Sequence, residues 1–354
     1  MALASIQTIK ELSPIPGADR IEKARVLGWD CVVKKGIFKE GDECIYVEID
    51  TLIPTCLLSD NPEERDLIRL KTVKMKGQLS QGLVLPLSHL KTFHANPDIA
   101  DLIEVSELSD IVAMLKKVDN GDVTTFLGIK KYEREMPGWA SLDTKGAFPN
   151  FIPRTDEVRI QSAPEILDAL NGRPYYITVK LDGTSATFYK KDGVFGVCSR
   201  NREMKDTEGN CYFYVARKYG IEEWLPDNFA VQGEIVGFWN CSPDGSFSKA
   251  IQGNKLGLEE TKLFLFNAYD IEEHQYVYPT RLPIPVEELS NILQFWVPEV
   301  EFGGSFSYTQ EQLLELAKGN YESGQIREGI VVRSIDPGIS FKVINNDFLL
   351  KNGE

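Results

Sequence analysis

The most constraining stretch is a lysine that precedes an Asp-Gly pair by two residues, at the end of an apolar run. Residues 174–179 are rich in aromatic and β-branched side chains, which predicts a strand entering a core. Strand side chains alternate, so Lys180 and Asp182 face one side, and Gly183 lets the backbone turn closely there. A lysine at the mouth of a buried pocket can lose its proton and become a nucleophile. Taken alone, the same residues also fit an ordinary surface strand end.

Five further segments follow this stretch in a fixed order. They span residues 199–201, 229–237, 263–271, 327–333 and 340–344. With residues 180–185 they match the six collinear motifs of a known superfamily. The chain therefore resembles the covalent nucleotidyltransferases, which comprise RNA ligases, DNA ligases and mRNA capping enzymes. The order of the segments is far more specific than any single one of them.

The resemblance implies a role for each motif. Lys180 is expected to form a lysyl-AMP phosphoramidate with ATP, and Lys342 to contact the α-phosphate. Arg200 is expected to bind ribose or phosphate. Phe266 is expected to stack on one face of the adenine, with Ile330 on the other. Judged without the resemblance, both apolar residues would be assigned to the core.

Three acids in separate motifs predict a metal site. Asp182, Glu234 and Glu328, brought to one point, would hold Mg²⁺ or Mn²⁺ through its water molecules. The ordinary pKa of lysine is about 10.4, so burial, a metal or other cations must lower the pKa of Lys180 before it reacts. Arg159, just upstream, either holds the departing pyrophosphate or pairs with neighbouring acids, and the sequence leaves both readings open.

The first ~120 residues predict a small β-rich domain. Short apolar runs at 24–27, 31–34 and 43–49 are separated by glycines. This pattern favours a closed barrel of the oligonucleotide-binding (OB) type. Within it lies a basic row, defined as Arg69, Lys71, Lys74 and Lys76. On a barrel strand the basic row would follow an RNA backbone, although an edge strand that uses lysine to resist aggregation is the alternative.

The predicted fold class is α+β. An N-terminal OB-like β-barrel spans residues 1–127, and a linker rich in glycine, proline and mixed charge spans residues 128–153. A nucleotidyltransferase domain (ATP-grasp-like ligase) of antiparallel sheets with flanking helices spans residues 154–354. Helices are predicted over residues 164–170 and 309–318.

Composition limits the possible partners and locations. The net charge of −14 is unfavourable for binding phosphates, so any RNA surface must be a local basic patch. The sequence has no apolar run long enough to span a membrane, and its first residues do not resemble a signal peptide. We therefore expect an intracellular protein, cytoplasmic or nuclear, that does not bind a membrane. The 6 cysteines form no C-x-x-C pair, which argues against structural zinc and favours reduced buried thiols. We also expect a monomer.

The order of the domains narrows the superfamily. DNA ligases and capping enzymes carry an OB domain after the last motif, whereas here the barrel-like region comes first. That order resembles RNA ligases of the Deinococcus and Naegleria type. One departure is Ile344, where many ligases have the second lysine of a Lys-x-Lys pair.

The resemblance implies an ATP-dependent RNA ligase for RNA repair. Such an enzyme seals 3′-OH to 5′-phosphate nicks in RNA or RNA/DNA duplexes, through lysyl-AMP and an adenylylated 5′-end. Two alternatives remain open. One is a GTP-dependent capping-type guanylyltransferase, and the other is a non-catalytic nucleic-acid binding protein with a degenerate transferase domain.

Overall fold

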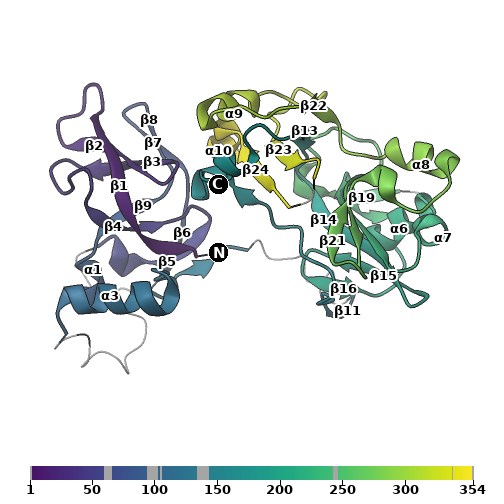
Figure 1. The fold of residues 1–354 in the computed structure, drawn as a ribbon, viewed down its shortest axis with the longest axis horizontal. Coiled ribbons are helices and arrows are strands. Elements are labelled where there is room, and N and C mark those ends of the chain that lie inside the picture. The colour runs from purple at the N-terminus through teal and green to yellow at the C-terminus, as the bar shows by residue number, and fades with distance from the viewer. Residues whose placement is uncertain are drawn as a thin grey trace. The chain divides into compact units, whose positions relative to one another are not determined.

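The computed structural model describes residues 2–59, 66–93, 103, 106–133, 143–241, 246–336 and 338–352. The chain divides into two compact units (Figure 1). Unit 1 comprises Met1–Arg134, Gln161–Pro164 and Leu349–Glu354, and unit 2 comprises Glu135–Ile160 and Glu165–Phe348. Two short segments beyond the predicted linker, at 161–164 and 349–354, thus group with the N-terminal unit.

Unit 1 is built on a curled antiparallel sheet with the strand order β3-β2-β1-β4-β9. One long strand holds it together, because the first part of β1 pairs with β4 and the second part pairs with β2. The register shifts between Ile9 and Glu11, and such an irregularity bends a strand. The strands are β1 (Ala4–Pro14), β2 (Ile21–Val26), β3 (Trp29–Lys34), β4 (Glu43–Val47) and β9 (Leu83–Pro86).

The basic row does not lie on one strand, so that part of the prediction was wrong. The chain leaves β6 (Leu67–Leu70), which pairs with β5 (Thr51–Pro54), before it enters β7 (Val73–Met75). The strand β7 forms a separate hairpin with β8 (Gln78–Ser80). Lys76 and Gly77 form its turn with φ values of 49° and 84°, as a two-residue hairpin turn of right-handed twist requires.

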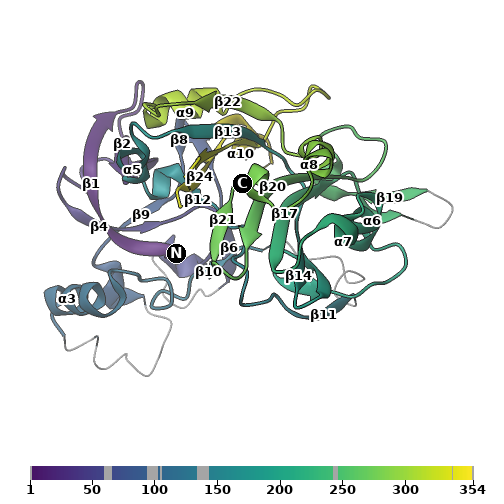
Figure 2. The same ribbon diagram turned by 45° about the vertical axis from the view of Figure 1, so that its right-hand side comes forward.

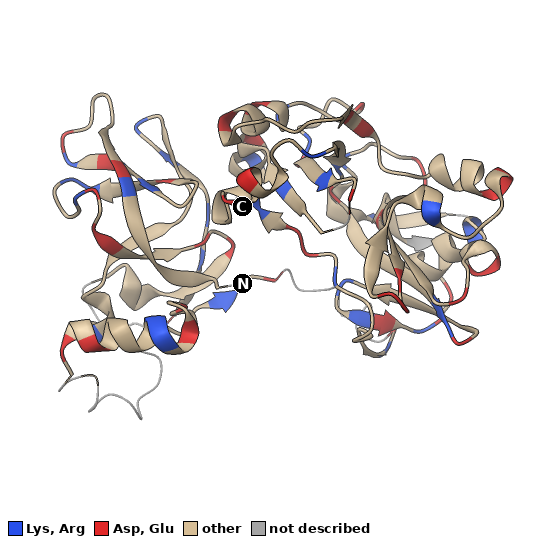
Figure 3. Cartoon of the chain, viewed as in Figure 1, with Lys and Arg blue, Asp and Glu red and all other residues tan. Residues whose placement is uncertain are grey.

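Two helices of unit 1 are α1 (His89–Thr92) and α3 (Leu108–Asp119). The helix α3 buries Ile111, Val112 and Leu115 against the apolar side of the curled sheet. It ends where Asn120 takes the left-handed conformation, which closes the last turn. Basic and acidic residues are interspersed along the chain of each unit (Figure 3).

The predicted linker contains two paired strands. The strand β10 (Lys130–Lys131) pairs with β5 in unit 1, and β11 (Thr144–Ala147) pairs with β16 in unit 2. Backbone hydrogen bonding therefore continues into both ends of the segment, and its composition alone did not reveal this. The boundaries at 127 and 153 stay predictions.

Unit 2 contains two main sheets. The seven-stranded sheet has the order β11-β16-β15-β14-β17-β20-β21, and the five-stranded sheet has the order β12-β24-β23-β13-β22. Neighbours are antiparallel except β12 and β24, which are parallel. The strands of the first sheet, besides β11, are β14 (Thr184–Lys191), β15 (Val194–Ser199), β16 (Arg202–Met204), β17 (Phe229–Val236), β20 (Lys262–Asp270) and β21 (Gln275–Val277). Those of the second are β12 (Val158–Arg159), β13 (Tyr175–Lys180), β22 (Glu299–Gly303), β23 (Gly329–Ser334) and β24 (Ser340–Ile344). A small hairpin joins β18 (Phe238–Cys241) to β19 (Phe247–Ala250).

Helices pack on the sheets of unit 2. The helices α6 and α7 share an apolar core with β14 and β17 of the seven-stranded sheet (Figure 2). The helix predicted over 309–318 is present as α9, and Thr309 caps it by accepting a hydrogen bond from Gln312 N. The helices are α5 (Ile166–Leu170), α6 (Cys211–Lys218), α7 (Ile221–Trp224), α8 (Val286–Leu293), α9 (Gln310–Leu316) and α10 (Asn346–Asn352).

The fold confirms the predicted α+β class. Both units are dominated by antiparallel sheets, and the helices lie outside them. In the part of the chain that the structure describes, no helix has the length and hydropathy to cross a membrane. The cysteines that it describes in full are buried free thiols, as expected for reduced cysteines: Cys31, Cys44, Cys56, Cys198 and Cys211.

Candidate active site

Lys180 lies where the chain passes from one sheet of unit 2 to the other. It is the last residue of β13, and it lies opposite Gly329 of β23. The next strand, β14, belongs to the seven-stranded sheet. A Cβ on Gly183 would lie 2.3 Å from the Ile235 carbonyl oxygen, so only glycine fits this crossing. Figure 1 shows β23 and β24, in yellow, beside the teal β13.

Three acidic side chains surround the crossing. Lys180 Nζ is 2.9 Å from the Glu328 carboxylate, which precedes β23. Glu234, on β17, accepts a hydrogen bond of 3.1 Å from the backbone N–H of Gly183. Asp182 lies in the crossing itself, two residues after Lys180, and the charges of Glu328 and Lys180 both affect its pKa. The structure therefore brings four predicted residues together from three separate motifs.

The surroundings of Lys180 raise its pKa. Burial lowers the pKa, but the charges of Glu328, Glu234 and Asp182 and the hydrogen bond to Glu328 outweigh it. The sequence reasoning expected burial and cations to lower the pKa for reaction. The carboxylates that make the site suitable for a metal also hold the proton on the lysine.

The same crowding raises the pKa values of the acids. Burial, together with repulsion by Glu328 and Asp182, raises the pKa of Glu234 to about 8. Burial and Glu328 raise the pKa of Asp182 to about 6, against the opposing charge of Lys255. Within the described residues, no cluster of three or more His, Cys, Asp or Glu side chains has the arrangement of a direct metal site. Clustered carboxylates of this kind are nevertheless the oxygen donors that hard divalent cations prefer.

A second lysine has the opposite shift. Lys342, on β24, is the register partner of Arg159 on the parallel strand β12. Burial and the charges of Arg159 and Lys180 lower the pKa of Lys342 to about 7. Arg159 and Lys342 thus lie side by side at one edge of the site, as the predicted phosphate-binding roles require.

Arg200 follows β15, at the turn into β16. Its guanidinium pairs with Asp156, and 44% of its side chain is exposed. The neighbouring Thr155 shares a hydrogen bond of 2.6 Å with Ser185, the last residue of the Lys180 motif. The segment before β12 therefore contacts both the start of β14 and the end of β15.

The structure does not support Ile330 as an adenine contact. Ile330 is fully buried, in a core with Phe306 and Phe341 behind the five-stranded sheet. Strand alternation places Val331 and Arg333 on the opposite face of β23. The Arg333 guanidinium is 5.5 Å from the Phe266 ring centroid, so the Phe266 side of the strand is the one that carries Val331. Val331, rather than Ile330, therefore lies on the Phe266 side of β23.

Sequence reasoning missed two side chains at the site. Lys255 Nζ is 2.5 Å from Asp182 Oδ2. Tyr321 donates a hydrogen bond of 2.8 Å to the Lys180 carbonyl oxygen and accepts one of 3.1 Å from Glu328 N. Neither residue belongs to a recognised motif, so the sequence offered no signal for either.

The basic row of unit 1 separates into two kinds of residue. Lys71, Lys74 and Lys76 are exposed. The guanidinium of Arg69 is already engaged within the protein, because it pairs with Asp50 at 2.6 Å and lies 3.9 Å from the Tyr132 ring centroid. Its side chain is only 14% exposed, so the prediction that it contacts RNA is not supported.

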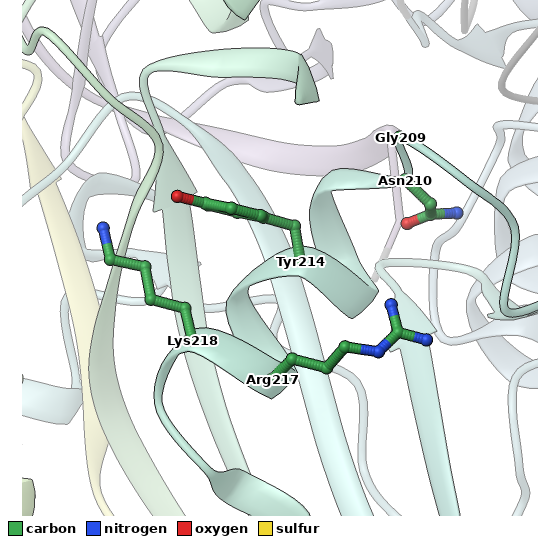
Figure 4. A pocket seen from close by; sticks show the side chains of 5 residues that line it. All are labelled: Gly209, Asn210, Tyr214, Arg217 and Lys218. Atoms are coloured by element: carbon green, nitrogen blue, oxygen red, sulfur yellow. The ribbon is translucent and has the colours of Figure 1, made fainter. Parts of the chain in front are cut away.

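A pocket of about 350 Å³ lies on α6, away from the predicted residues. It is lined by Gly209, Asn210, Tyr214, Arg217 and Lys218. Figure 4 shows Tyr214, Arg217 and Lys218 extending from the helix. Both cations have acidic partners, since Arg217 pairs with Asp206 and Lys218 lies 2.8 Å from Glu260. Since acidic side chains already neutralise both cations, the pocket gives no evidence for a particular ligand.

Comparison with known proteins identifies the family. A family model described as RNA ligase matches residues 173–344, and one described as an OB-fold domain matches residues 3–87. A structure of a Naegleria gruberi RNA ligase mutant with AMP and Mn is 35% identical, with a TM-score of 0.79 over 99% of each chain. The same ligase with PPi is 34% identical, with a TM-score of 0.78 over 99% of this chain and 98% of that one.

A further mutant of that ligase was solved with ATP and Mn. It is 35% identical, covers 99% of this chain and 98% of that chain, and has a TM-score of 0.78. The search of curated proteins gives no match. Since the similarity to the Naegleria enzyme extends over nearly the whole of both chains, this protein belongs to the RNA ligase family.

Proposed function

We propose that the protein is an ATP-dependent RNA ligase that joins a 3′-OH to a 5′-phosphate through lysyl-AMP. The observation that carries the proposal is the contact of 2.9 Å between Lys180 Nζ and Glu328, with Asp182 and Glu234 beside it. The similarity to Naegleria gruberi RNA ligase, which has been solved with ATP and Mn and with PPi, supports ATP as the substrate.

The first step transfers AMP to Lys180. The unprotonated Nζ attacks the α-phosphorus of ATP, an N–P bond forms, and the bond to the pyrophosphate oxygen breaks. Nζ must first lose a proton, and the Glu328 carboxylate at 2.9 Å is the base placed to accept it. The following steps pass AMP to the RNA 5′-phosphate and then displace it with the 3′-OH.

Asp182, Glu234 and Glu328 would hold Mg²⁺ or Mn²⁺ through its water molecules. The raised pKa values of Asp182 and Glu234 support this fit, because crowded carboxylates gain from a nearby cation. When bound, the ion neutralises negative charge at the α-phosphate and at the acids around Lys180.

Five other side chains are proposed to hold the nucleotide. Lys342 would contact the α-phosphate and Arg159 the pyrophosphate, since the two cations are neighbours on parallel strands. Arg200 would bind ribose or phosphate. Phe266, which is partly buried on β20, would stack on the adenine. In place of Ile330 we propose Val331 as the residue on the other face of the base.

The RNA is proposed to be a nicked RNA or RNA/DNA duplex. Lys71, Lys74 and Lys76 would contact its backbone, because these lysines lie exposed on and around the β7–β8 hairpin. We also expect the protein to act as a monomer.

Incubation with α-labelled ATP and Mg²⁺, followed by denaturation, tests the first step. Wild-type protein should retain the label. Labelling of Lys180→Ala should fall below about one thousandth of the wild-type level, because the nucleophile is gone. Removal of the metal with EDTA should abolish labelling of the wild type. Glu315→Gln, which changes an exposed acid on α9, should label like wild type.

The alternatives give different outcomes. Labelling by GTP in place of ATP would support a capping-type guanylyltransferase. No label from either nucleotide would support a non-catalytic binding protein. Equal labelling of wild type and Lys180→Ala would show that another residue is the nucleophile.

A further inference from the structure

Lys255 is a partly buried cation of the candidate site that lies outside the six motifs. It lies between β19 and β20, and its side chain is 18% exposed. It follows three residues in the left-handed conformation: Gln252 (φ 48°), Gly253 (φ 74°) and Asn254 (φ 46°). Two of these are not glycine, and such conformations carry an energetic cost. Strained segments of this kind often accompany functional positions.

The loop that carries Lys255 is tightly fixed. Asn254 Nδ2 donates to the Leu258 carbonyl oxygen at 2.7 Å, and Asn254 Oδ1 accepts from Leu258 N at 3.1 Å. Ser323 Oγ donates to the Lys255 carbonyl oxygen at 2.5 Å. These bonds hold the backbone of Lys255 on both sides, so the loop presents the side chain in a defined direction.

The ammonium of Lys255 has two partners. Nζ is 2.5 Å from Asp182 Oδ2, and it lies 4.3 Å from the centroid of the Phe348 ring. Asp182 is only 12% exposed, so little water screens the ion pair. The aromatic ring adds cation–π attraction on a second side. Lys255 therefore lies directly against one of the acids proposed to hold the metal.

The ion pair between Lys255 and Asp182 affects how a metal ion could bind. Lys180 pairs with Glu328, and Lys255 pairs with Asp182. Two of the three proposed metal acids thus already have an ammonium partner. A divalent cation that approaches these acids meets two fixed positive charges at short range, in a poorly screened site.

We infer that Lys255 is an internal counter-ion that occupies Asp182 and opposes divalent metal binding in the ATP-free protein. This inference rests on the proposed function, because it takes Asp182 as a metal-holding acid. ATP brings several negative charges, which offset the repulsion, so the metal enters together with the nucleotide. Lys255 is a positioning residue in this account, since it acts through Asp182.

Titration of the ATP-free, full-length protein with Mn²⁺ tests the inference, with calorimetry as the readout. Lys255→Met keeps the length of the side chain and removes its charge. It should bind Mn²⁺ about tenfold more tightly than wild type, or more. Lys255→Arg, which retains the charge, should bind like wild type. If Lys255→Met does not fold, Lys255→Gln takes its place.

A double-mutant cycle connects the effect to Asp182. In an Asp182→Asn background, Lys255→Met should tighten Mn²⁺ binding by a clearly smaller factor, because the repulsion is still relieved but no carboxylate is released. The inference is overturned if Lys255→Met binds Mn²⁺ like wild type or more weakly, or if the gain is undiminished without the Asp182 carboxylate. Failure of the wild type to bind Mn²⁺ even with ATP would instead overturn the metal site of the proposed function.

Discussion

Lys180 and Lys342 occupy one site, yet their pKa values shift in opposite directions. Lys180 is surrounded by carboxylates, which raise its pKa although burial opposes them. Lys342 is partly buried next to Arg159 and Lys180, and burial together with these cations lowers its pKa to about 7. Burial alone would lower the pKa of both lysines, so the difference between them comes from the charges of their neighbours.

The lowered pKa of Lys342 predicts a pH-dependent stability. Between about 7 and the ordinary lysine pKa of about 10.4, the unfolded chain binds a proton that the folded protein does not. The free energy of unfolding should therefore rise with pH in that range. Below about 7 both states hold the proton, and the buried charge lowers the stability of the folded protein.

Denaturant unfolding of wild type and Lys342→Met from about pH 6 to about pH 10 measures this effect. The variant lacks the group, so the stability of wild type relative to the variant should increase with pH. Lys10→Met, at an exposed position on β1, should follow wild type. Parallel curves for wild type and Lys342→Met would contradict the lowered pKa.

Individual residues show what the sequence can and cannot predict about the site. Motif order was enough to select Lys180, Asp182, Glu234 and Glu328, which the structure brings together. Lys255 could not be selected, because its role depends on a loop conformation and on a partner 73 positions away.

The structure gives two predicted site residues, Ile330 and Arg69, surroundings that the sequence did not indicate. Ile330 and Val331 are adjacent and both aliphatic, and only the pairing of β23 decides which faces Phe266. The ion pair between Arg69 and Asp50 joins residues 19 positions apart, so the basic row alone could not reveal it.

At the scale of elements, the crossing from β13 to β14 is the critical feature of unit 2. Gly183 lies where β14 meets β17, and a Cβ there would also lie 2.9 Å from Glu234 Cγ. Gly329 meets a similar restriction, because its φ is 152° and a Cβ would lie 2.1 Å from the Val343 carbonyl oxygen. The glycines next to Asp182 and Glu328 thus let the strands approach closely enough to bring the acids together.

Gly183→Ala should therefore lower the free energy of unfolding by about 1–3 kcal/mol, as overpacking against backbone does. Gly304→Ala is the matched control, because a Cβ there meets nothing within 4 Å and the backbone is not left-handed. The control should stay within about 0.5 kcal/mol of wild type in denaturant unfolding. Equal stability of the two variants would contradict the steric argument.

The elements were predicted well where local pattern determines them. The strand over β13 and the helix over α9 follow from apolar runs and a capping residue. The sequence analysis placed the basic row on one strand, because a polar sequence gives little indication of where one strand ends and the next begins. Its division between β6 and β7 depends on the partners β5 and β8, which pairing in three dimensions selects.

At the scale of the whole molecule, the net charge of −14 makes RNA binding depend on a few local cations. The exposed members of the basic row are Lys71, Lys74 and Lys76. Replacing all three with alanine should reduce the sealing of nicked RNA about tenfold or more, and should flatten its dependence on salt. Adenylylation of Lys180 should stay within about twofold of wild type.

A triple-alanine variant of Lys10, Lys34 and Lys39 provides the control, because these lysines are also exposed in unit 1. It should seal nearly as well as wild type. Equal loss in both triple variants would indicate a general charge effect. Loss of adenylylation in the Lys71, Lys74 and Lys76 variant would indicate that this region contributes to the first step.

The division into units was only partly accessible from the sequence. The contacts define two units, and the first of them contains the β-rich region that precedes the Lys180 motif. The short segments 161–164 and 349–354 group with unit 1 through contacts far apart in the sequence, and no local composition marks them. Long-range contacts of this kind are invisible to pattern reading.

The register of β24 also determines when the site becomes complete during synthesis. Lys342 lies on β24, which inserts between β12 and β23, and Glu328 lies 148 positions after Lys180. A growing chain therefore carries the proposed nucleophile long before it carries the acid that pairs with it. Until β24 has left the ribosome and joined its two neighbours, the proposed site lacks Lys342, so we expect no adenylylation of the nascent chain.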